Sequence, residues 1–229
     1  MKLPLVFAAA VLIAFPAFSR ADMVVVQDVQ GAGQSGQMTI KIKGDKTRAD
    51  VSAQMSSITD TATGDSVMLM HLSKNYMKLS AAKTKALVEK MKQMREKMDP
   101  QGAKNDEDTF TSPKPTGKQQ KIGEYNAQEF VSQAGSTSFH FWVAKDFPNG
   151  AALQEQMSKF QEKGLSQVLK GKAVSLKDLP GIAVKTEIEF NGQKISYTLV
   201  SIKEEEVSAK EFEIPQGYQE MAMPSFGEQ

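Results

Sequence analysis

Residues 182–221 read IAVKTEIEFNGQKISYTLVSIKEEEVSAKEFEIPQGYQEM and contain the clearest hairpin signal in the chain. Asn191-Gly192 suits a two-residue type I′ turn, because both central residues of that turn need a positive φ. A turn at this place pairs Phe190 with Gln193 and fixes the later pairs in steps of two residues. The sequence therefore predicts a long hairpin with a defined register.

This register gives the hairpin one apolar face and one charged face. The predicted pairs on the apolar face are Ile188–Ile195, Thr186–Tyr197 and Val184–Leu199. The pairs on the other face are Glu189–Lys194, Glu187–Ser196 and Lys185–Thr198. We expect the apolar face to cover other apolar residues, while Lys185, Glu187 and Glu189 stay in water.

Residues 1–21 have the organisation of an export signal. Lys2 supplies a positive charge, residues 3–18 are mainly apolar, and Ser19-Arg20-Ala21 is a small-x-small cleavage site. A membrane anchor is the alternative, but the apolar run is short for a span of about 20 residues and contains two prolines. We predict cleavage before Asp22 and a periplasmic or secreted protein, since the chain has no cysteine to carry a lipid.

Composition limits what residues 22–229 can be. They are numerous enough for one β-rich domain with an ample core, which must hold without disulfides because cysteine is absent. The formal net charge of +1 becomes −1 once Lys2 and Arg20 are removed with the signal, which argues against a nucleic-acid partner.

Strand patterns fill the first third of this domain. Residues 38–43 alternate cleanly, with Met38, Ile40 and Ile42 on one side. Residues 67–72, VMLMHL, are apolar on both faces, so we expect both faces to be covered, one of them by a helix. The strands predicted in this part are residues 23–29, 38–43, 46–52, 55–60, 67–72 and 75–80.

A basic patch is expected on the second and third strands. Lys41, Lys43, Lys46 and Arg48 share the outer face of the hairpin that turns at Gly44-Asp45. Like charges that face each other across strands are mildly unfavourable, so the patch invites an anionic membrane surface or an envelope protein. The alternative is a solvated edge on which lysines block pairing between sheets.

Two amphipathic helices interrupt the strands. Residues 81–98 place Leu87, Met91, Met94 and Met98 on one helical stripe, which ends at Asp99-Pro100. A second helix begins after Pro148-Asn149, and its stripe contains Leu153, Met157 and Phe160.

The segment between the helices divides into a loop and two further strands. Residues 100–117 have little apolar content and predict a mobile loop. Strands are predicted at residues 118–132 and 137–144. The order predicts an α+β fold: a strongly curved antiparallel sheet of about ten strands, a half-barrel, with both helices on its concave side.

Several longer segments resemble a known family. They are GDKTRADVS at residue 44, TGKQQKIGEYNAQEF at residue 116, LPGIAVKTEI at residue 179 and FEIPQGYQEM at residue 212. Over residues 37–221 the chain is similar to a secreted bacterial family known as domain of unknown function 4412. That family resembles the periplasmic lipoprotein-carrier superfold, a curved half-barrel closed by helices. The resemblance to the carrier superfold implies binding of an acyl chain, and the family itself has no agreed activity to carry over.

Catalytic signals are weak. The two histidines, His71 and His140, each lie within a predicted strand beside apolar residues, where a structural role is commoner than a base. The sequence contains no nucleophile-elbow, zinc-protease or phosphate-loop motif. We therefore expect that the protein is not an enzyme and carries no cofactor. We also expect a monomer.

Three functions remain open. The first is a carrier of a lipid or another apolar small molecule, whose cleft lies between the concave sheet and the helices. The second is a copper(I) protein that uses the helix methionines, and the third is a protein-interaction module with an empty core. The residues expected to line the apolar cleft are Ile40, Leu87, Met91, Met94, Met98, Trp142, Met157, Phe160, Ile188, Tyr197 and Leu199.

Overall fold

The computed structural model describes residues 22–83, 85–86, 89–90, 110–163, 174–190 and 192–222. The predicted signal at residues 1–21 and most of the predicted loop at residues 100–117 lie outside this part of the chain. None of the helices in the described residues is long and apolar enough to cross a membrane.

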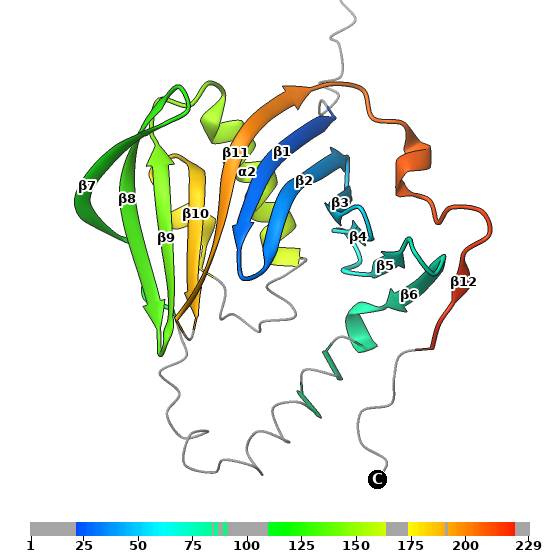
Figure 1. Ribbon diagram of the computed structural model, residues 1–229. Coiled ribbons are helices and arrows are strands. Elements are labelled where there is room, and N and C mark those ends of the chain that lie inside the picture. The colour runs from blue at the N-terminus through cyan, green and yellow to red at the C-terminus, as the bar shows by residue number, and fades with distance from the viewer. Residues whose placement is uncertain are drawn as a thin grey trace, which may run out of the picture.

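The described chain forms one curved sheet of twelve strands, with the order β12-β6-β5-β4-β3-β2-β1-β11-β10-β9-β8-β7 (Figure 1). All neighbours are antiparallel except β12 and β6, which are parallel. The sheet is open, with β12 and β7 as its two edges. The strands are β1 (Met23–Gly31), β2 (Gln34–Lys43), β3 (Lys46–Ser52), β4 (Met55–Asp60), β5 (Ser66–Met70), β6 (Asn75–Leu79), β7 (Lys114–Ile122), β8 (Tyr125–Ala134), β9 (Thr137–Ala144), β10 (Ile182–Phe190), β11 (Gln193–Glu204) and β12 (Gln219–Glu220).

The hairpin of β10 and β11 has the predicted register. Phe190 pairs with Gln193, Ile188 with Ile195, and the pairing continues to Lys185 opposite Thr198. Gly192 has a φ of 75°, which is the positive value that the turn requires.

Bulges separate the two strands beyond that point. One lies in β10 between Ala183 and Lys185, and another shifts β11 against Val26 and Gln27 of β1. A bulge increases local twist. The strands diverge from their common turn as Figure 1 shows, and they leave room for the helix α2 (Gly150–Lys163) beside β11.

Alternation in β1 separates two apolar layers. Val25 belongs to the larger core, together with Ile40 of β2 and Ala49 of β3, and we call this side of the sheet the inner face. Leu153 of α2 packs into the same core, so α2 covers the inner face. Val24 points the other way, to the outer face.

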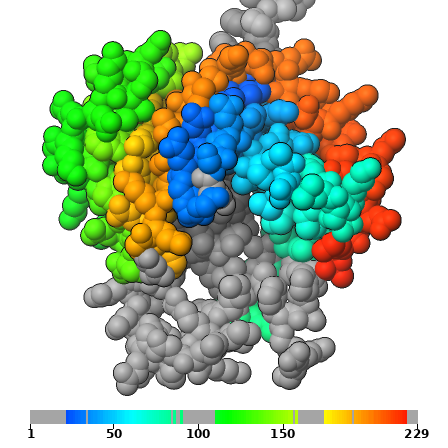
Figure 2. Space-filling view, in the orientation of Figure 1, coloured from blue at the N-terminus to red at the C-terminus, as the bar shows by residue number. Residues whose placement is uncertain are grey.

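The C-terminal segment covers the outer face of β3–β6. Val207 and Phe212, the latter in the short helix η2 (Ala209–Phe212), pack on Ile58 and Leu69. Figure 2 shows this orange and red segment against the cyan and teal strands. The expectation that residues 67–72 are covered is therefore met on this face by the C-terminal segment, which includes the short helix η2.

The twelve strands exceed the ten that the pattern predicts. The predicted strand at residues 118–132 is a hairpin of β7 and β8, which turns at Gly123-Glu124. β7 begins at Lys114, so the end of the predicted loop is a strand. β12 is a two-residue edge strand that no alternation could reveal.

The first predicted helix is visible only in part. Residues 81–83, 85–86 and 89–90 are helical, as the 3.6-residue period indicates. Leu87, Met91, Met94 and Met98 lie outside the described residues.

Candidate functional site: an apolar groove beside helix α2

An apolar groove lies where β11 separates from β10. Its volume is about 390 Å³, within the range typical of small-molecule sites. The residues that line it are Met23, Tyr125, Phe147, Pro148, Asn149, Leu153, Leu199, Val200, Ser201, Ile202 and Glu204. Each wall comes from a different part of the chain: the sheet, the β7–β8 turn and the start of α2.

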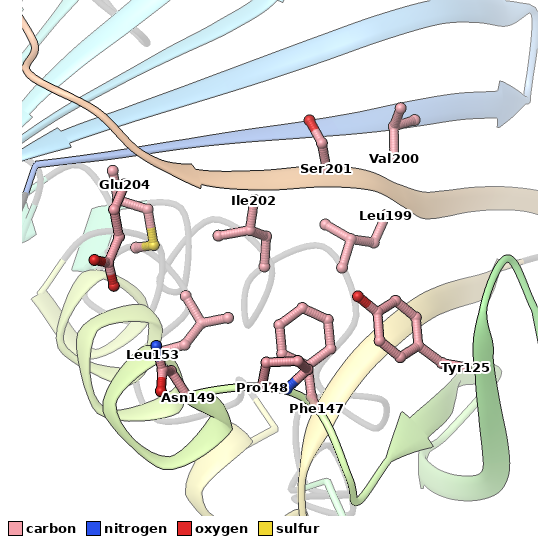
Figure 3. A pocket seen from close by; sticks show the side chains of 11 residues that line it. Tyr125, Phe147, Pro148, Asn149, Leu153, Leu199, Val200, Ser201, Ile202 and Glu204 are labelled. Carbon is pink, nitrogen blue, oxygen red and sulfur yellow. The ribbon is translucent and has the colours of Figure 1, made fainter.

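The β11 wall presents its side chains in two directions. Leu199 and Ile202 point toward Phe147 and Tyr125, whereas Val200 and Ser201 point away from them (Figure 3). Val200 is half exposed, at 50%. The bulge at this point allows Leu199 and Ile202 to point into the groove, while the two residues between them point to the opposite surface.

Aromatic rings form the wall opposite β11. The rings of Tyr125 and Phe147 lie 4.7 Å apart between centroids with an interplanar angle of 30°. Leu153, on the first turn of α2, closes the groove below Ile202. The polar groups are the Tyr125 hydroxyl, which points between Leu199 and Phe147, and the Asn149 amide and Glu204 carboxylate, which lie on the side of Leu153. Such a groove suits a mainly apolar ligand with one polar end.

Some residues predicted to line a cleft are near this groove, and others are not. Leu199 lines it, and Ile40 and Trp142 are buried in the core beneath it. Met157 packs on that core and lines a smaller cavity between α2 and residues 176–183. Ile188 and Tyr197 are half-buried near the other end of the hairpin. Phe160 lies within α2, but its side chain is outside the described part.

The charged face of the hairpin is less exposed than predicted. The side chain of Glu187 is only 12% exposed, and it pairs with Lys185 at 2.8 Å and Lys194 at 3.0 Å. Burial alone would raise the pKa of Glu187, but hydrogen bonds and charge from these two lysines outweigh it and lower the pKa. Glu189, with 49% of its side chain exposed, remains in water. The prediction was wrong for Lys185 and Glu187 because Glu187 pairs with Lys185 of its own strand and Lys194 of the neighbouring strand in a compact ion cluster.

The basic patch is neutralised by acidic partners. Lys41 pairs with Glu211 at 2.9 Å, and Lys43 forms an ion pair with Asp22. Arg48 pairs with Asp50 at 2.7 Å and also donates to the backbone oxygen of Glu211. Lys46 is exposed at the turn. The four cations lie together as expected, but Lys41 and Arg48 hold the C-terminal segment to the sheet, and Lys43 holds Asp22.

A second polar cluster surrounds Glu129, whose side chain is only 3% exposed. Its carboxylate accepts a hydrogen bond from Thr116 at 2.6 Å, and it lies 2.9 Å from His140 Nδ1 and 3.3 Å from Lys118. Burial alone would raise the pKa of Glu129, but these partners outweigh it and lower the pKa. Several donors are what a buried carboxylate requires.

His140 also has the neighbours of a hydrolase base. Its Nε2 lies 3.2 Å from Ser138 Oγ, so Ser138, His140 and Glu129 follow the order of a catalytic triad. Ser138 and His140 are two residues apart on one face of β9, which brings their side chains together whatever their role. The contacts of Glu129 with Thr116 and Lys118 account for the cluster as an electrostatic anchor of β7 on β8.

The sequence does not single out several residues that form the groove. Met23, Tyr125, Phe147 and Ile202 are spread over four segments and become neighbours only through the twist of the sheet. The one local signal is Phe147-Pro148-Asn149, where an aromatic residue precedes the start of a predicted helix.

Comparison with known protein families identifies the family of this chain. The profile of the DUF4412 family, described as a domain of unknown function, matches residues 22–218. The chain therefore belongs to this family, which confirms the resemblance found in the sequence. No curated protein gave a match.

Similar solved structures share little sequence with this chain. One structure of PNGF-II has 14% identity and a TM-score of 0.40, and it covers 88% of this chain. This chain spans only 31% of the length of that PNGF-II chain. The lipoprotein LppX of Mycobacterium tuberculosis has 10% identity, a TM-score of 0.36 and coverage of 81% of this chain and 88% of its own. A DUF1329 family protein from Desulfovibrio piger has 10% identity, a TM-score of 0.33 and coverage of 84% and 90%.

Proposed function

We propose that this protein binds an apolar ligand, a lipid or a single acyl chain, in the groove between β11 and α2. The observation that carries the proposal is the groove itself, about 390 Å³ in volume and lined mainly by aliphatic and aromatic side chains, with the polar groups of Tyr125, Asn149 and Glu204 among them. Burial of an alkyl chain contributes about 0.8 kcal/mol for each methylene removed from water. The polar end of the ligand would lie near Tyr125, Asn149 or Glu204.

A carrier role in the bacterial envelope follows from this proposal and the predicted signal. The exported chain would take up its ligand in the periplasm or outside the cell.

No chemical step is required, and we propose that the protein is not an enzyme. Incubation with a p-nitrophenyl ester tests this, because Ser138→Ala should leave hydrolysis at the level of the parent protein. A clear loss of turnover in that variant would instead make Ser138 a nucleophile.

We propose that the protein is a monomer. β7 is an edge strand, and Lys114, Pro115, Lys118 and Lys121 lie along it. Lysine and proline on an edge strand oppose pairing with another sheet. Light scattering of the purified protein should give the mass of one chain; a dimer would favour the interaction-module alternative.

The groove is tested by filling it. Leu199→Trp places a larger side chain in existing space, so it should block binding of a fluorescent fatty acid while leaving the melting temperature nearly unchanged. Leu72→Trp is the control, because Leu72 lies outside the groove and is already 80% exposed. Native mass spectrometry of protein from its own envelope should show a bound lipid. Equal binding by both variants, or no binding by the parent protein, would refute the proposal.

A further inference from the structure

Four methionines meet on the inner face at the far end of the sheet from the groove. Met55 of β4 lies directly opposite Met70 of β5, and Met68 of β5 lies directly opposite Met77 of β6. Met68 and Met70 are two residues apart, so both pairs project from the same face. All four side chains are half-buried.

The opposite side of these strands has a different composition. Leu69, between Met68 and Met70, is completely buried on the outer face with Ile58, under Val207 and Phe212. The apolar burial that stabilises this end of the sheet is therefore aliphatic. Methionine occupies the face that remains partly accessible.

The geometry allows several sulfurs to reach one ion. Directly opposed residues of antiparallel strands have Cβ atoms about 4.5–5.5 Å apart, and a flexible methionine side chain can move its sulfur toward the partner. The two pairs share β5, which makes them adjacent.

The residues around the four methionines indicate which metal ion the site would bind. Ser57, Thr59, Ser66, Asn75 and Leu79 occupy other inner-face positions of these strands, and none is charged. Neutral thioethers are soft ligands that favour copper(I), whereas magnesium and calcium need oxygen ligands. We propose that Met55, Met68, Met70 and Met77 form a copper(I) site, separate from the helix methionines considered from the sequence.

This site does not depend on the proposed apolar groove, which is built from β11, the β7–β8 turn and α2. Methionines on a sheet can also act only as an adaptable apolar surface. Leucine distinguishes the two roles, because it retains the apolar volume and removes the sulfur.

The test is an anaerobic competition for copper(I) between the purified full chain and bathocuproine disulfonate. The parent protein should remove copper(I) from the chelator with saturable stoichiometry. The variant with all four methionines replaced by leucine should bind at least about tenfold more weakly, with an unchanged circular dichroism spectrum. Met38→Leu is the matched control, since Met38 packs on the inner core at β2, and it should bind like the parent.

Sulfur as the ligand is checked by X-ray absorption at the copper edge, which should show a shell of sulfur neighbours. The proposal is overturned if the parent protein fails to compete with the chelator. It is equally overturned if the fourfold variant retains parental affinity or if Met38→Leu weakens binding as strongly. Fatty-acid binding by the fourfold variant should be unchanged, which keeps failure of this site separate from failure of the groove.

Discussion

The hydroxyl of Tyr218 lies 2.6 Å from Nδ1 of His71, although 147 residues separate the two in the chain. The other ring nitrogen lies 2.7 Å from Ser56 Oγ, which donates to Asp50 at 2.6 Å. Because Ser56 gives its only proton to Asp50, its oxygen accepts from Nε2 of His71, and Nδ1 of His71 is the ring nitrogen that contacts the Tyr218 hydroxyl. This chain of hydrogen bonds fastens the C-terminal segment to β3 and β4.

Tyr218→Phe should therefore loosen the C-terminal segment. The change removes one hydrogen bond and leaves Nδ1 of His71 without its partner, which should lower the free energy of unfolding by about 1 kcal/mol. Urea denaturation measures the loss. Tyr76→Phe is the control, because the Tyr76 hydroxyl bonds to Glu220 in an exposed position. Equal losses in the two variants would show that the His71 contact is unimportant.

Glu129 should make stability depend on pH. Its pKa is lowered in the folded protein, since donors and Lys118 outweigh burial. A carboxyl with a lowered folded pKa stabilises the fold fully above its ordinary pKa of 4.5, and the contribution disappears as the pH falls through the folded value.

Glu129→Gln should cost about 1–3 kcal/mol at neutral pH, where the charge-assisted bonds are lost. Below pH 4 the difference in stability between this variant and the parent protein should shrink. Thermal melts of both proteins across this pH range measure the difference. A constant difference at all pH values would exclude the ionised carboxylate as the cause. Glu124→Gln, in the exposed β7–β8 turn, provides a control.

Gly31 should not tolerate a side chain. Its φ is 111°, and a Cβ would overlap the carbonyl oxygen of Lys194 in the neighbouring strand. Gly31→Ala should cost more than about 3 kcal/mol, because β1 and β11 must separate. Gly33→Ala has a positive φ but open space, so only backbone strain of about 1–2 kcal/mol is expected. Chemical denaturation measures the free energy of unfolding of both variants. Gly31→Ala should lose more stability than Gly33→Ala, and similar losses would contradict this prediction.

The hairpin offers three adjacent substitutions with different outcomes. Ile188→Glu should cost about 1–3 kcal/mol by placing a charge among apolar neighbours. Glu187→Lys should also be destabilising, since it places a third cation beside Lys185 and Lys194. Glu189→Gln should stay within about 0.5 kcal/mol. If Glu187→Lys melts at the parental temperature, the ion cluster does not stabilise the hairpin.

Much of the sheet could be predicted because alternation and turn chemistry are local. Asn191-Gly192 specifies a turn, and the apolar and polar residues on either side allow only one register. β7 escaped detection in part because its sequence, KPTGKQQKI, shows no apolar alternation. Eight of its nine residues are exposed, and an edge strand can pair through its backbone alone.

The groove could not be predicted in the same way. It depends on where β10 and β11 separate, and that depends on bulges opposite β9 and β1. A bulge adds one residue against a partner strand, so its position is a property of two distant segments. The burial of Glu187 has the same origin, because one of its two cations, Lys194, comes from the neighbouring strand.

The place of β1 in the sheet constrains the order in which the protein can fold. β1 is the first strand of the described residues, yet it lies between β2 and β11, and Met23 faces Ile42 on one side and Glu204 on the other. A chain that emerges from its N-terminus can pair β1 with β2 early, but the opposite edge stays vacant until residue 204 is available. Contacts between such distant residues slow folding, and an open edge invites pairing with other chains. A newly made chain would therefore expose this edge of β1 until most of its residues have been synthesised.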